Sequence, residues 1–506
     1  MKNSLLILTF LISLLNYAQR QPNIVLIISD DHSFQSIGAY NKEKTSYTPN
    51  IDKLADQGLT FNKAYVANSI CGPSRACILT GKFSHKNGFT DNETSHYNSN
   101  QQQFVNLLQN NGYQTAWIGK YHLGKDPKGF DFFKILVEQG HYFNPDFIIE
   151  GGKVVREMGY ESDIVQNEAE KWLDNRNPEK PFCLILGHKA THRTWMPDVQ
   201  DLGKFEHVSF PLPDNFYDDY QGRTAAAMQE MSIAKDLQMG YDLKMFFGEG
   251  QEADHNFSRM TPEQLAAYRN FYTPIQNELE NKKLTGKALT EWKFQRYMRD
   301  YYATVLSLDR NIGRMLDYLD RKQLTDNTIV IYLSDQGFYM GEHGWYDKRW
   351  MYEESFRTPM IARFPKVIQP KQTTESFVMN VDIAPTLLEA AGIPVPTDMQ
   401  GVSFFPILKK PRKETRNSVY YHYYENGEHA VSPHFGIKNK RYKLIRYYKR
   451  HNGWELFDLK TDPREMHNIY KLPSSKKIIK KMKKLLEKEI DKLDDTTAQE
   501  VLHKIN

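Results

Sequence analysis

Two apolar segments far apart in the chain each end in acidic and amide residues. The first, NIVLIISDD, ends at Asp30 and Asp31, and the second, TIVIYLSDQG, ends at Asp335 and Gln336 before a glycine. Short, continuous apolar runs of this kind are typical of strands that are buried on both faces of a parallel sheet. We therefore expect a sheet that is covered by other elements on both sides.

Further strands and helices alternate between these two segments. Strands are predicted around Thr115 to Ile118 and around Phe182 to Leu186, and helices over NIDKLADQGLTF and QQFVNLLQNNG. The apolar spacing of RYMRDYYATVLSLDRNIGRMLDYLD predicts a helix that leads into the strand at Thr328. Strands that alternate with helices indicate an α/β fold whose functional loops follow the carboxyl ends of the strands.

The chain is predicted to divide into a leader and two domains. Residues 1–18 combine Lys2 with a short apolar run and Ala18, which is typical of a cleaved signal peptide and too short for a membrane span. Residues 19–410 would form the catalytic domain, with a largely irregular or helical insertion over about 198–293. We expect the mature protein to be soluble and periplasmic or secreted, without a membrane or nucleic-acid partner.

Residues 411–506 differ in their sequence pattern from the preceding part of the chain and are predicted to form a smaller α+β subdomain. Short aromatic strands, SVYYHYY, HFGIKNKRYKLIRYY and WELFDL, suggest an antiparallel sheet. The final stretch, KKIIKKMKKLLEKEIDKLDD, has one apolar stripe opposite its lysines. A basic amphipathic helix can bind membranes or anionic polymers, but we favour a helix that docks on the sheet.

Composition excludes several classes of protein. The 66 lysines and arginines nearly balance the 62 aspartates and glutamates, so the net charge is only +4, and a hydrophobic content of 40% excludes a disordered chain. Three cysteines, Cys71, Cys77 and Cys183, are too few for a disulfide scaffold, and their odd number leaves at least one unpaired within the chain.

The acidic residues after the two apolar strands predict a metal site. Parallel strands bring their carboxyl ends together, so Asp30, Asp31 and Asp335 would meet beside the amide of Gln336. Three carboxylates this close repel one another unless a cation neutralises them. Oxygen ligands of this type suit Ca²⁺ or, less well, Mg²⁺.

The most specific string in the chain is CGPSRACILTG, which starts at Cys71. It resembles the signature of the type I, formylglycine-dependent sulfatases. NIVLIISDDH, TPNIDKLADQG, GYQTAWIGKYHLG, IVIYLSDQG and WELFDLKTDPREMHN resemble other blocks of that family in the same order. The resemblance implies an alkaline-phosphatase-like mixed sheet between helices, with a C-terminal subdomain of antiparallel sheet plus helix.

The resemblance also implies that Cys71 is oxidised to Cα-formylglycine by a separate maturation enzyme. One hydroxyl of the hydrated aldehyde attacks sulfur and the ester alcohol leaves; the other hydroxyl then expels sulfate, which divides the reaction into two easier steps. Residue 71 would join Asp30, Asp31, Asp335 and Gln336 around one Ca²⁺.

Cationic donors are needed because the transferred sulfuryl group spreads negative charge over its oxygens. By resemblance, Arg75 holds the hydrate and a metal carboxylate, and Lys120 contacts the nucleophile and the sulfate. His122 takes the proton in the elimination step.

Two further positions resemble sulfate-binding residues of the family. His192 would bind sulfate and protonate the leaving oxygen. His188 is a competing candidate, and His192 is preferred because it lies next to a family-like turn that ends at Pro197. Lys348, within GWYDKRWMYEES, would contact both the sulfate and the bridging oxygen.

The C-terminal subdomain is similar to that of glucosamine 6-sulfatases. Tyr424, Glu425, His429 and His434 are therefore candidate sugar contacts, although an aromatic core explains the tyrosine equally well. The expected activity is that of a sulfuric ester hydrolase on 6-O-sulfated N-acetylglucosamine or a related sugar of a sulfated glycan.

Three alternatives remain open at this point. The substrate could be another sulfated polysaccharide of the algal galactan or ulvan type. A phosphomonoesterase or phosphonate hydrolase of the same superfold would share the aspartate cluster. The third alternative is a glycan-binding protein without catalytic activity. The presence of all the candidate catalytic and metal-binding residues argues against this alternative.

Overall fold

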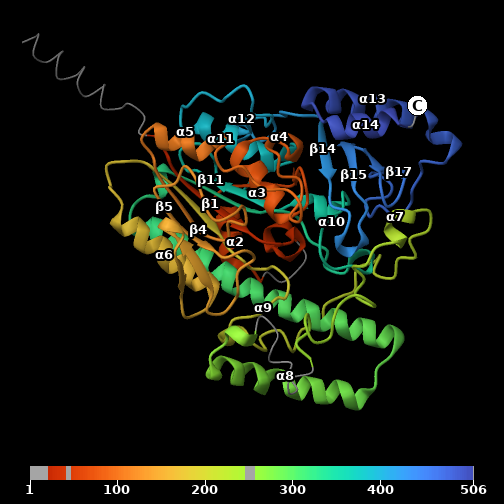
Figure 1. Ribbon diagram of the computed structural model, residues 1–506, viewed down its shortest axis with the longest axis horizontal. Helices are drawn as coiled ribbons and strands as arrows, with labels where there is room; N and C mark the ends of the chain where they lie inside the picture. The colour runs from red at the N-terminus through yellow and green to blue at the C-terminus, as the bar shows by residue number, and fades with distance from the viewer. Residues whose placement is uncertain (1–20, 42–46, 246–256, 505–506) are drawn as a thin grey trace, which may run out of the picture.

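The computed structural model describes residues 21–41, 47–245 and 257–504, so the predicted signal peptide over residues 1–18 lies outside the described residues. Its centre is a mixed sheet of ten strands (Figure 1). In spatial order the strands are β12 (Gln372–Thr374), β2 (Leu59–Phe61), β11 (Met360–Arg363), β9 (Thr328–Ser334), β1 (Asn23–Ser29), β8 (Phe182–Gly187), β4 (Gln114–Gly119), β5 (Phe132–Leu136), β6 (Asp146–Ile149) and β7 (Val154–Arg156).

The five central strands, from β9 to β5, are parallel, and antiparallel strands flank them on both sides. The four strands predicted from apolar runs all lie in this central part. Since parallel neighbours present their carboxyl ends at the same edge, the residues that follow β1, β4, β8 and β9 are brought together there.

Helices cover both faces of the sheet (Figure 1). Alternate residues of β1 belong to different apolar clusters: Val25 and Ile27 pack on one face, and Leu26 and Ile28 on the other. The first face is covered by α2 (Pro49–Asp56), α6 (Glu161–Asn175) and α9 (Gly286–Arg321); the second is covered by α3 (Cys71–Thr80), α5 (Phe104–Asn110), α11 (Ile383–Ala390) and α12 (Phe405–Lys409). Burial on both faces is the physical reason for the continuous apolar runs.

Residues 198–293 contain helices but no strand among those that the structure describes. They include the short helix α7 (Thr224–Ala227) and the longer α8 (Pro262–Lys282). Thr261 and Gln264 cap α8 by exchanging hydrogen bonds between side chain and backbone. The long helix α9 begins within this segment at Gly286 and leads into β9, as predicted.

The C-terminal residues form the predicted antiparallel sheet, which has four strands. Its strands are β14 (Ser418–Tyr423), β15 (His434–Asn439), β16 (Tyr442–Tyr447) and β17 (Gly453–Asp458). Helix α13 (Lys476–Leu493) packs on β15 and β16 and buries Met482, Leu486 and Ile490, and the short α14 (Thr496–His503) follows. The apolar stripe is therefore that of a docking helix, as expected.

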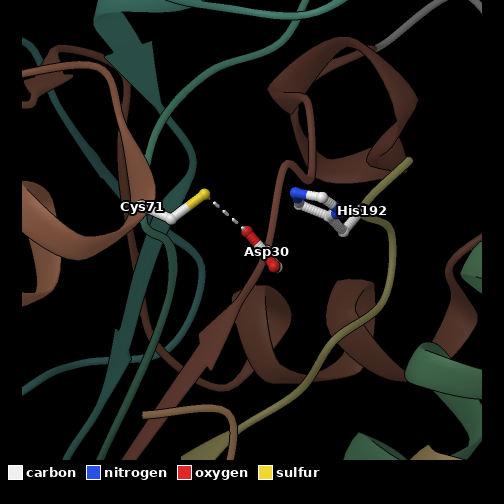
Figure 2. Close-up of side chains that lie close together, drawn as sticks. All are labelled: Asp30, Cys71 and His192. Carbon is white, nitrogen blue, oxygen red and sulfur yellow. Dashed lines mark hydrogen bonds between the residues drawn. The ribbon is translucent and has the colours of Figure 1, made fainter. Parts of the chain in front are cut away.

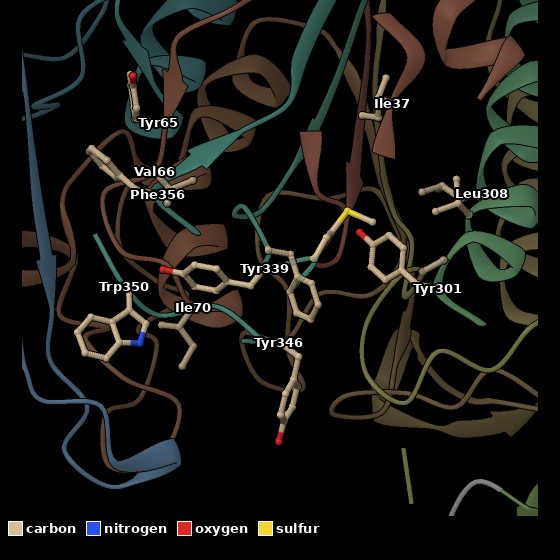
Figure 3. Close-up of a cluster of buried hydrophobic side chains, with 14 of the residues drawn as sticks. Ile37, Tyr65, Val66, Ile70, Tyr301, Leu308, Tyr339, Tyr346, Trp350 and Phe356 are labelled. Carbon is tan, nitrogen blue, oxygen red and sulfur yellow. The ribbon is translucent and has the colours of Figure 1, made fainter. Parts of the chain in front are cut away.

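A continuous apolar cluster connects the two sheets (Figure 3). It extends from Tyr301 on α9 through Tyr339 to Trp350 and Phe356, and on to the aromatic residues of β14 to β16. The small sheet β10 (Arg357–Thr358), β3 (Ala64–Tyr65) and β13 (Val378–Met379), with α4 (Ser84–Asn87) and α10 (Glu353–Phe356), completes the elements near this junction. Within the described ranges, none of the helices combines the length and apolarity that a bilayer span requires.

Candidate active site

The acidic residues after β1 and β9 lie side by side, as predicted. Ser29 and Ser334 are register partners, so Asp30 and Asp335 follow them on adjacent strands. Asp31 adopts a left-handed φ of 62°, and its backbone N–H donates to Oδ1 of Asp335 over 3.3 Å. Oxygens of Asp30, Asp31 and Asp335 all lie within 4.8 Å of one another, and the three residues are fully buried.

Cys71 is the first residue of α3 and points into this cluster. Its Sγ donates a hydrogen bond to Oδ1 of Asp30 over 3.3 Å. In Figure 2 the sulfur of Cys71 and the ring of His192 approach the Asp30 carboxylate from opposite sides. Burial, reinforced by the charge of Asp30, raises the pKa of the Cys71 thiol, so an unmodified cysteine would be a neutral thiol here.

Three cations surround the carboxylates. Lys120, which follows β4, forms an ion pair with Asp30, and Lys348 Nζ lies 2.6 Å from Oδ2 of Asp31. Arg75 donates from Nε to Oδ2 of Asp335 over 2.9 Å and from Nη1 to the backbone oxygen of Lys120 over 2.7 Å. The structure therefore brings together all three cations that the sequence singled out.

The protonation of the carboxylates follows from burial and from their neighbours. Burial alone would raise the pKa of Asp30, but Lys120, His192 and Arg75 hold it well below its usual range. Burial raises the pKa of Asp31 to about 6 against the effect of Lys348, and burial together with Asp30 raises that of Asp335 to about 7. The cluster thus carries more carboxylates than the neighbouring cations can stabilise in their charged form.

The donor set fits a hard cation. Besides the three carboxylates, Oε1 of Gln336 is buried without a hydrogen-bond partner, while its amide nitrogen lies 2.5 Å from Oδ1 of Asp31. Carboxylate and amide oxygens are the ligands that Ca²⁺ prefers, and a thiol is not. Residue 71 would complete this set only with an oxygen in place of its sulfur.

His192 lies at this site and lines a cavity above Cys71, whereas the competing candidate His188 does not line that cavity. Thr191 N–H donates to the backbone oxygen of Asp30 over 2.6 Å, which ties the loop after β8 to the end of β1. His192 Nδ1 donates to the Arg193 carbonyl over 2.6 Å, and Nε2 lies 3.9 Å from Oδ2 of Asp31. Burial and Lys120 lower the pKa of His192 well below its usual value, so Nε2 is an acceptor in the resting site.

His122 lies two residues beyond Lys120 at a left-handed φ of 58° and does not line the cavity. Burial and the charge of Lys120 lower its pKa well below the usual value, and its Nδ1 is buried without a hydrogen-bond partner. His122 is therefore a neutral imidazole close enough to Lys120 and Asp30 for their charges to affect it.

A cavity of about 270 Å³ opens above Cys71 and is lined by His192, Lys348 and Glu425. Of the other predicted sugar contacts, Tyr424 lines a neighbouring cavity. His434 is fully buried, with both ring nitrogens bonded to backbone groups of Ser432 and Met351, so it lies away from the cavity.

His429 does not line the cavity but contacts a residue that does. It bonds to Oδ2 of Asp347 and to the Glu230 carbonyl, both over 2.8 Å. The sequence reasoning missed several cavity residues, namely Asn92, Glu93, Gln139, Arg193, Tyr241, Asp347, Arg349 and Glu428. Asp347 and Arg349 flank Lys348 in the sequence, and this adjacency is the signal that could have identified them.

Comparison with known proteins identifies the family to which most of the chain is similar. The Sulfatase family matches residues 22–393, and the family described as N-sulphoglucosamine sulphohydrolase, C-terminal, matches residues 341–492. An N-acetylglucosamine-6-O-sulfatase of Bacteroides thetaiotaomicron is 46% identical over 495 residues, which cover 95% of this chain and 88% of that relative. The human N-acetylglucosamine-6-sulfatase is 27% identical over 447 residues, which cover 82% of this chain and 69% of the human protein.

A solved structure of a protein in complex with its substrate D-glucosamine-2-N,6-O-disulfate superposes with a TM-score of 0.92 at 46% identity. The match covers 94% of this chain and 99% of that one. The described fold is thus the alkaline-phosphatase-like sulfatase fold with its C-terminal four-stranded sheet. The chain belongs to the sulfatase family and is a sulfuric ester hydrolase.

Proposed function

We propose that the protein removes the 6-O-sulfate from a glucosamine or N-acetylglucosamine residue of a sulfated glycan. The observation that carries the proposal is the cavity above Cys71, where cations for a sulfate and fixed polar groups for a sugar line the same space. The named activities of the relatives and the disulfated glucosamine bound in the solved structure support this substrate class.

The sulfate end of the cavity is built by Lys348, His192 and residue 71. Burial lowers the pKa of Lys348, but Asp31 and other nearby anions outweigh it and hold that pKa well above the usual value, so the ammonium stays charged beside the sulfate. His192 presents an unprotonated Nε2 to the cavity in the resting site. The negative charge of a bound sulfate ester would favour the imidazolium, which can then donate its proton to the leaving oxygen.

Two groups would complete this site. Converted to Cα-formylglycine by a maturation enzyme, residue 71 would supply a hydroxyl nucleophile from which sulfate can later be released. A calcium ion held by Asp30, Asp31, Asp335 and Gln336 would neutralise the carboxylates and polarise a sulfate oxygen. Arg75 would hold Asp335 in position for this ion.

The sugar end is built by three charged groups, Asp347, Arg349 and Glu425, each of which is held by a neighbouring residue. Arg349 donates from Nη1 to Oε2 of Glu425 over 2.6 Å, and Asp347 accepts from His429 and from the Lys348 N–H. Fixed carboxylates and a guanidinium at a cavity wall suit the hydroxyl groups of a sugar ring, because each can accept or donate in a set direction.

Two measurements test the proposal: the turnover of different sulfated and phosphorylated substrates, and the chemical state of residue 71. We expect turnover of 6-O-sulfated N-acetylglucosamine, weaker turnover of sugars sulfated at other ring positions, and preference for an aryl sulfate over the matching aryl phosphate. Mass spectrometry of the peptide containing residue 71 should show aldehyde in place of thiol when a maturation enzyme is co-expressed. Full activity of Cys71→Ala, or preference for the phosphate, would exclude the proposal.

We further propose that the protein is exported, since residues 1–18 have the pattern of a cleaved signal peptide. N-terminal sequencing of the protein released from the periplasm or medium of an expressing cell tests this. A mature chain that still starts at Met1 would contradict it.

A further inference from the structure

A second, larger cavity lies beside the one above Cys71, and the two share Glu93 and Glu425 as a common wall. Its volume of about 550 Å³ lies in the range of pockets that hold a ligand. Segments far apart in the chain build it, including His85 of α4, the loop after β14 and the start of α14. Neither the catalytic residues nor the metal ligands described above line this space.

One side of the second cavity is a tyrosine held in a fixed position. The ring of Tyr424 stacks on that of His422, with 3.7 Å between ring centroids. Its hydroxyl lies 3.4 Å from both Asp495 Oδ2 and His85 Nδ1, and Asp495 also accepts from His422. The stacking holds one face of the Tyr424 ring, and the hydroxyl contacts hold its edge. A ring held in this way can pack against a ligand with its other face without a further loss of side-chain conformational entropy.

The common wall is fixed in a similar way. Glu425 accepts from the Asn92 N–H over 3.0 Å and from Arg349 over 2.6 Å. The loop that carries Asn92 is held by Asp91, which accepts from Thr94 and Ser95. A chain leaving the first cavity past Glu425 would therefore enter a second site that is already formed.

The lining of the second cavity matches a sugar better than an apolar ligand or an ion. Hydroxyl and amide groups of Thr90, Thr94, Asn426 and Thr497 surround the tyrosine rings of Tyr424 and Tyr448. Lys449 stands against the carboxylates of Asp91, Glu93 and Glu425, which disfavours an anion, and Asp91 and Glu425 already accept hydrogen bonds from protein groups, which makes them poor ligands for a cation. Tyrosine rings together with hydroxyl-binding groups are the usual means of holding a sugar ring.

We propose that the second cavity binds the sugar unit linked to the one that loses its sulfate. This inference rests on the proposed function for the first cavity and extends it to the next residue of the glycan. The wild-type enzyme is expected to have a kcat/KM about tenfold higher on a trisaccharide with a terminal 6-O-sulfated glucosamine than on the free monosaccharide, equivalent to roughly 1.4 kcal/mol of added binding.

Thr497→Trp, near the start of α14, fills the second cavity with a large side chain. We expect it to remove the advantage of the trisaccharide and to leave turnover of the monosaccharide as in the parent. Glu500→Trp, on the exposed side of the same helix, is the matched control and should keep the advantage.

Equal kcat/KM of the wild type on the two substrates would overturn the proposal, and this comparison depends on no variant. An equal loss on both substrates in Thr497→Trp alone would also overturn it. Calorimetric binding of the desulfated trisaccharide tests the second cavity separately from the reaction. If the wild type binds the desulfated trisaccharide and Thr497→Trp does not, the second site is supported even if the enzyme removes sulfate from neither substrate. If the wild type does not bind the desulfated trisaccharide, the second site is refuted.

Discussion

Arg75 is fully buried and connects two parts of the active site through one guanidinium group. Removing it in Arg75→Ala leaves the carboxylate of Asp335 and the carbonyl of Lys120 without their donor. We expect the free energy of unfolding to fall by about 3–5 kcal/mol, the usual cost of breaking a buried ion pair by deleting one partner. Urea unfolding followed by circular dichroism measures this.

Arg75→Lys is the matched variant for this prediction. A lysine keeps the charge, but its single ammonium group cannot reach both acceptors as the planar guanidinium does. Its stability should lie between that of Arg75→Ala and the parent. An Arg75→Ala protein within about 0.5 kcal/mol of the parent, as for an ordinary surface substitution, would refute the prediction.

Both ring nitrogens of His429 are bonded, one to the Asp347 carboxylate and the other to the Glu230 carbonyl. His429→Ala should lower kcat/KM for a sulfated sugar about tenfold, mainly through KM, because a charge-assisted hydrogen bond contributes at least about 1.5 kcal/mol.

Steady-state kinetics on a sulfated sugar and on an aryl sulfate separate this positioning role from a general loss of structure. The aryl sulfate has no sugar hydroxyl for Asp347 to bind, so its turnover should change less. His467→Ala, at an exposed histidine, is the control and should behave as the parent. An equal loss on both substrates in His429→Ala would count against the assignment.

At the scale of elements, the C-terminal sheet contains a buried acid that makes stability depend on pH. Glu455 on β17 accepts from the hydroxyls of Tyr352 and Tyr447 over 2.8 and 2.9 Å. Burial raises its pKa to about 7. The native state thus keeps a proton that the unfolded chain loses near pH 4, so the stability from this group is complete below about pH 4 and is lost as the pH rises through about 7.

Glu455→Gln should flatten this dependence because the amide does not titrate. Between about pH 5 and about pH 8 the free energy of unfolding of the parent should fall by up to about 3 kcal/mol more than that of the variant. Urea unfolding of both proteins at the two pH values measures the difference. Glu500→Gln, at an exposed position of α14, should keep the slope of the parent; an unchanged slope in Glu455→Gln would contradict the prediction.

At the scale of the whole molecule, the proposed metal site connects strands that lie about 300 residues apart in the sequence. Because β1 and β9 meet only in the folded chain, Ca²⁺ should bind the native state alone and raise the melting temperature. At about 100 times its dissociation constant, the ion would add about 2.7 kcal/mol to the free energy of unfolding. A chelator should reverse the shift.

Thermal unfolding with and without Ca²⁺ checks this, with residue 71 in its converted form. Asp31→Asn removes a ligand and should abolish the shift, whereas Asp326→Asn, exposed and outside the site, should retain it. A shift of the same size in Asp31→Asn would show that the ion binds elsewhere.

Much of the fold was predictable because it depends on local patterns. The alternation of neighbours such as Val25 and Leu26 between two cores requires an apolar residue at each position from Ile24 to Ile28, and such a run can be read directly. The cap of α8 at Thr261 is equally local. The carboxylates could be grouped because they follow apolar strands that were recognisable, and Cys71 joined them through the resemblance of its CGPSR motif to the sulfatase signature.

Sequence patterns alone therefore identified the covered parallel sheet, the acidic strand ends and the CGPSR motif, since each rests on neighbouring residues. Only the tertiary structure decided which distant side chains share a cavity. Asn92 and Glu425 are 333 residues apart and still share a hydrogen bond, and His434 is buried while Glu425 lines the cavity. Exposure and long-range contact depend on how whole elements pack, and no local pattern records that packing.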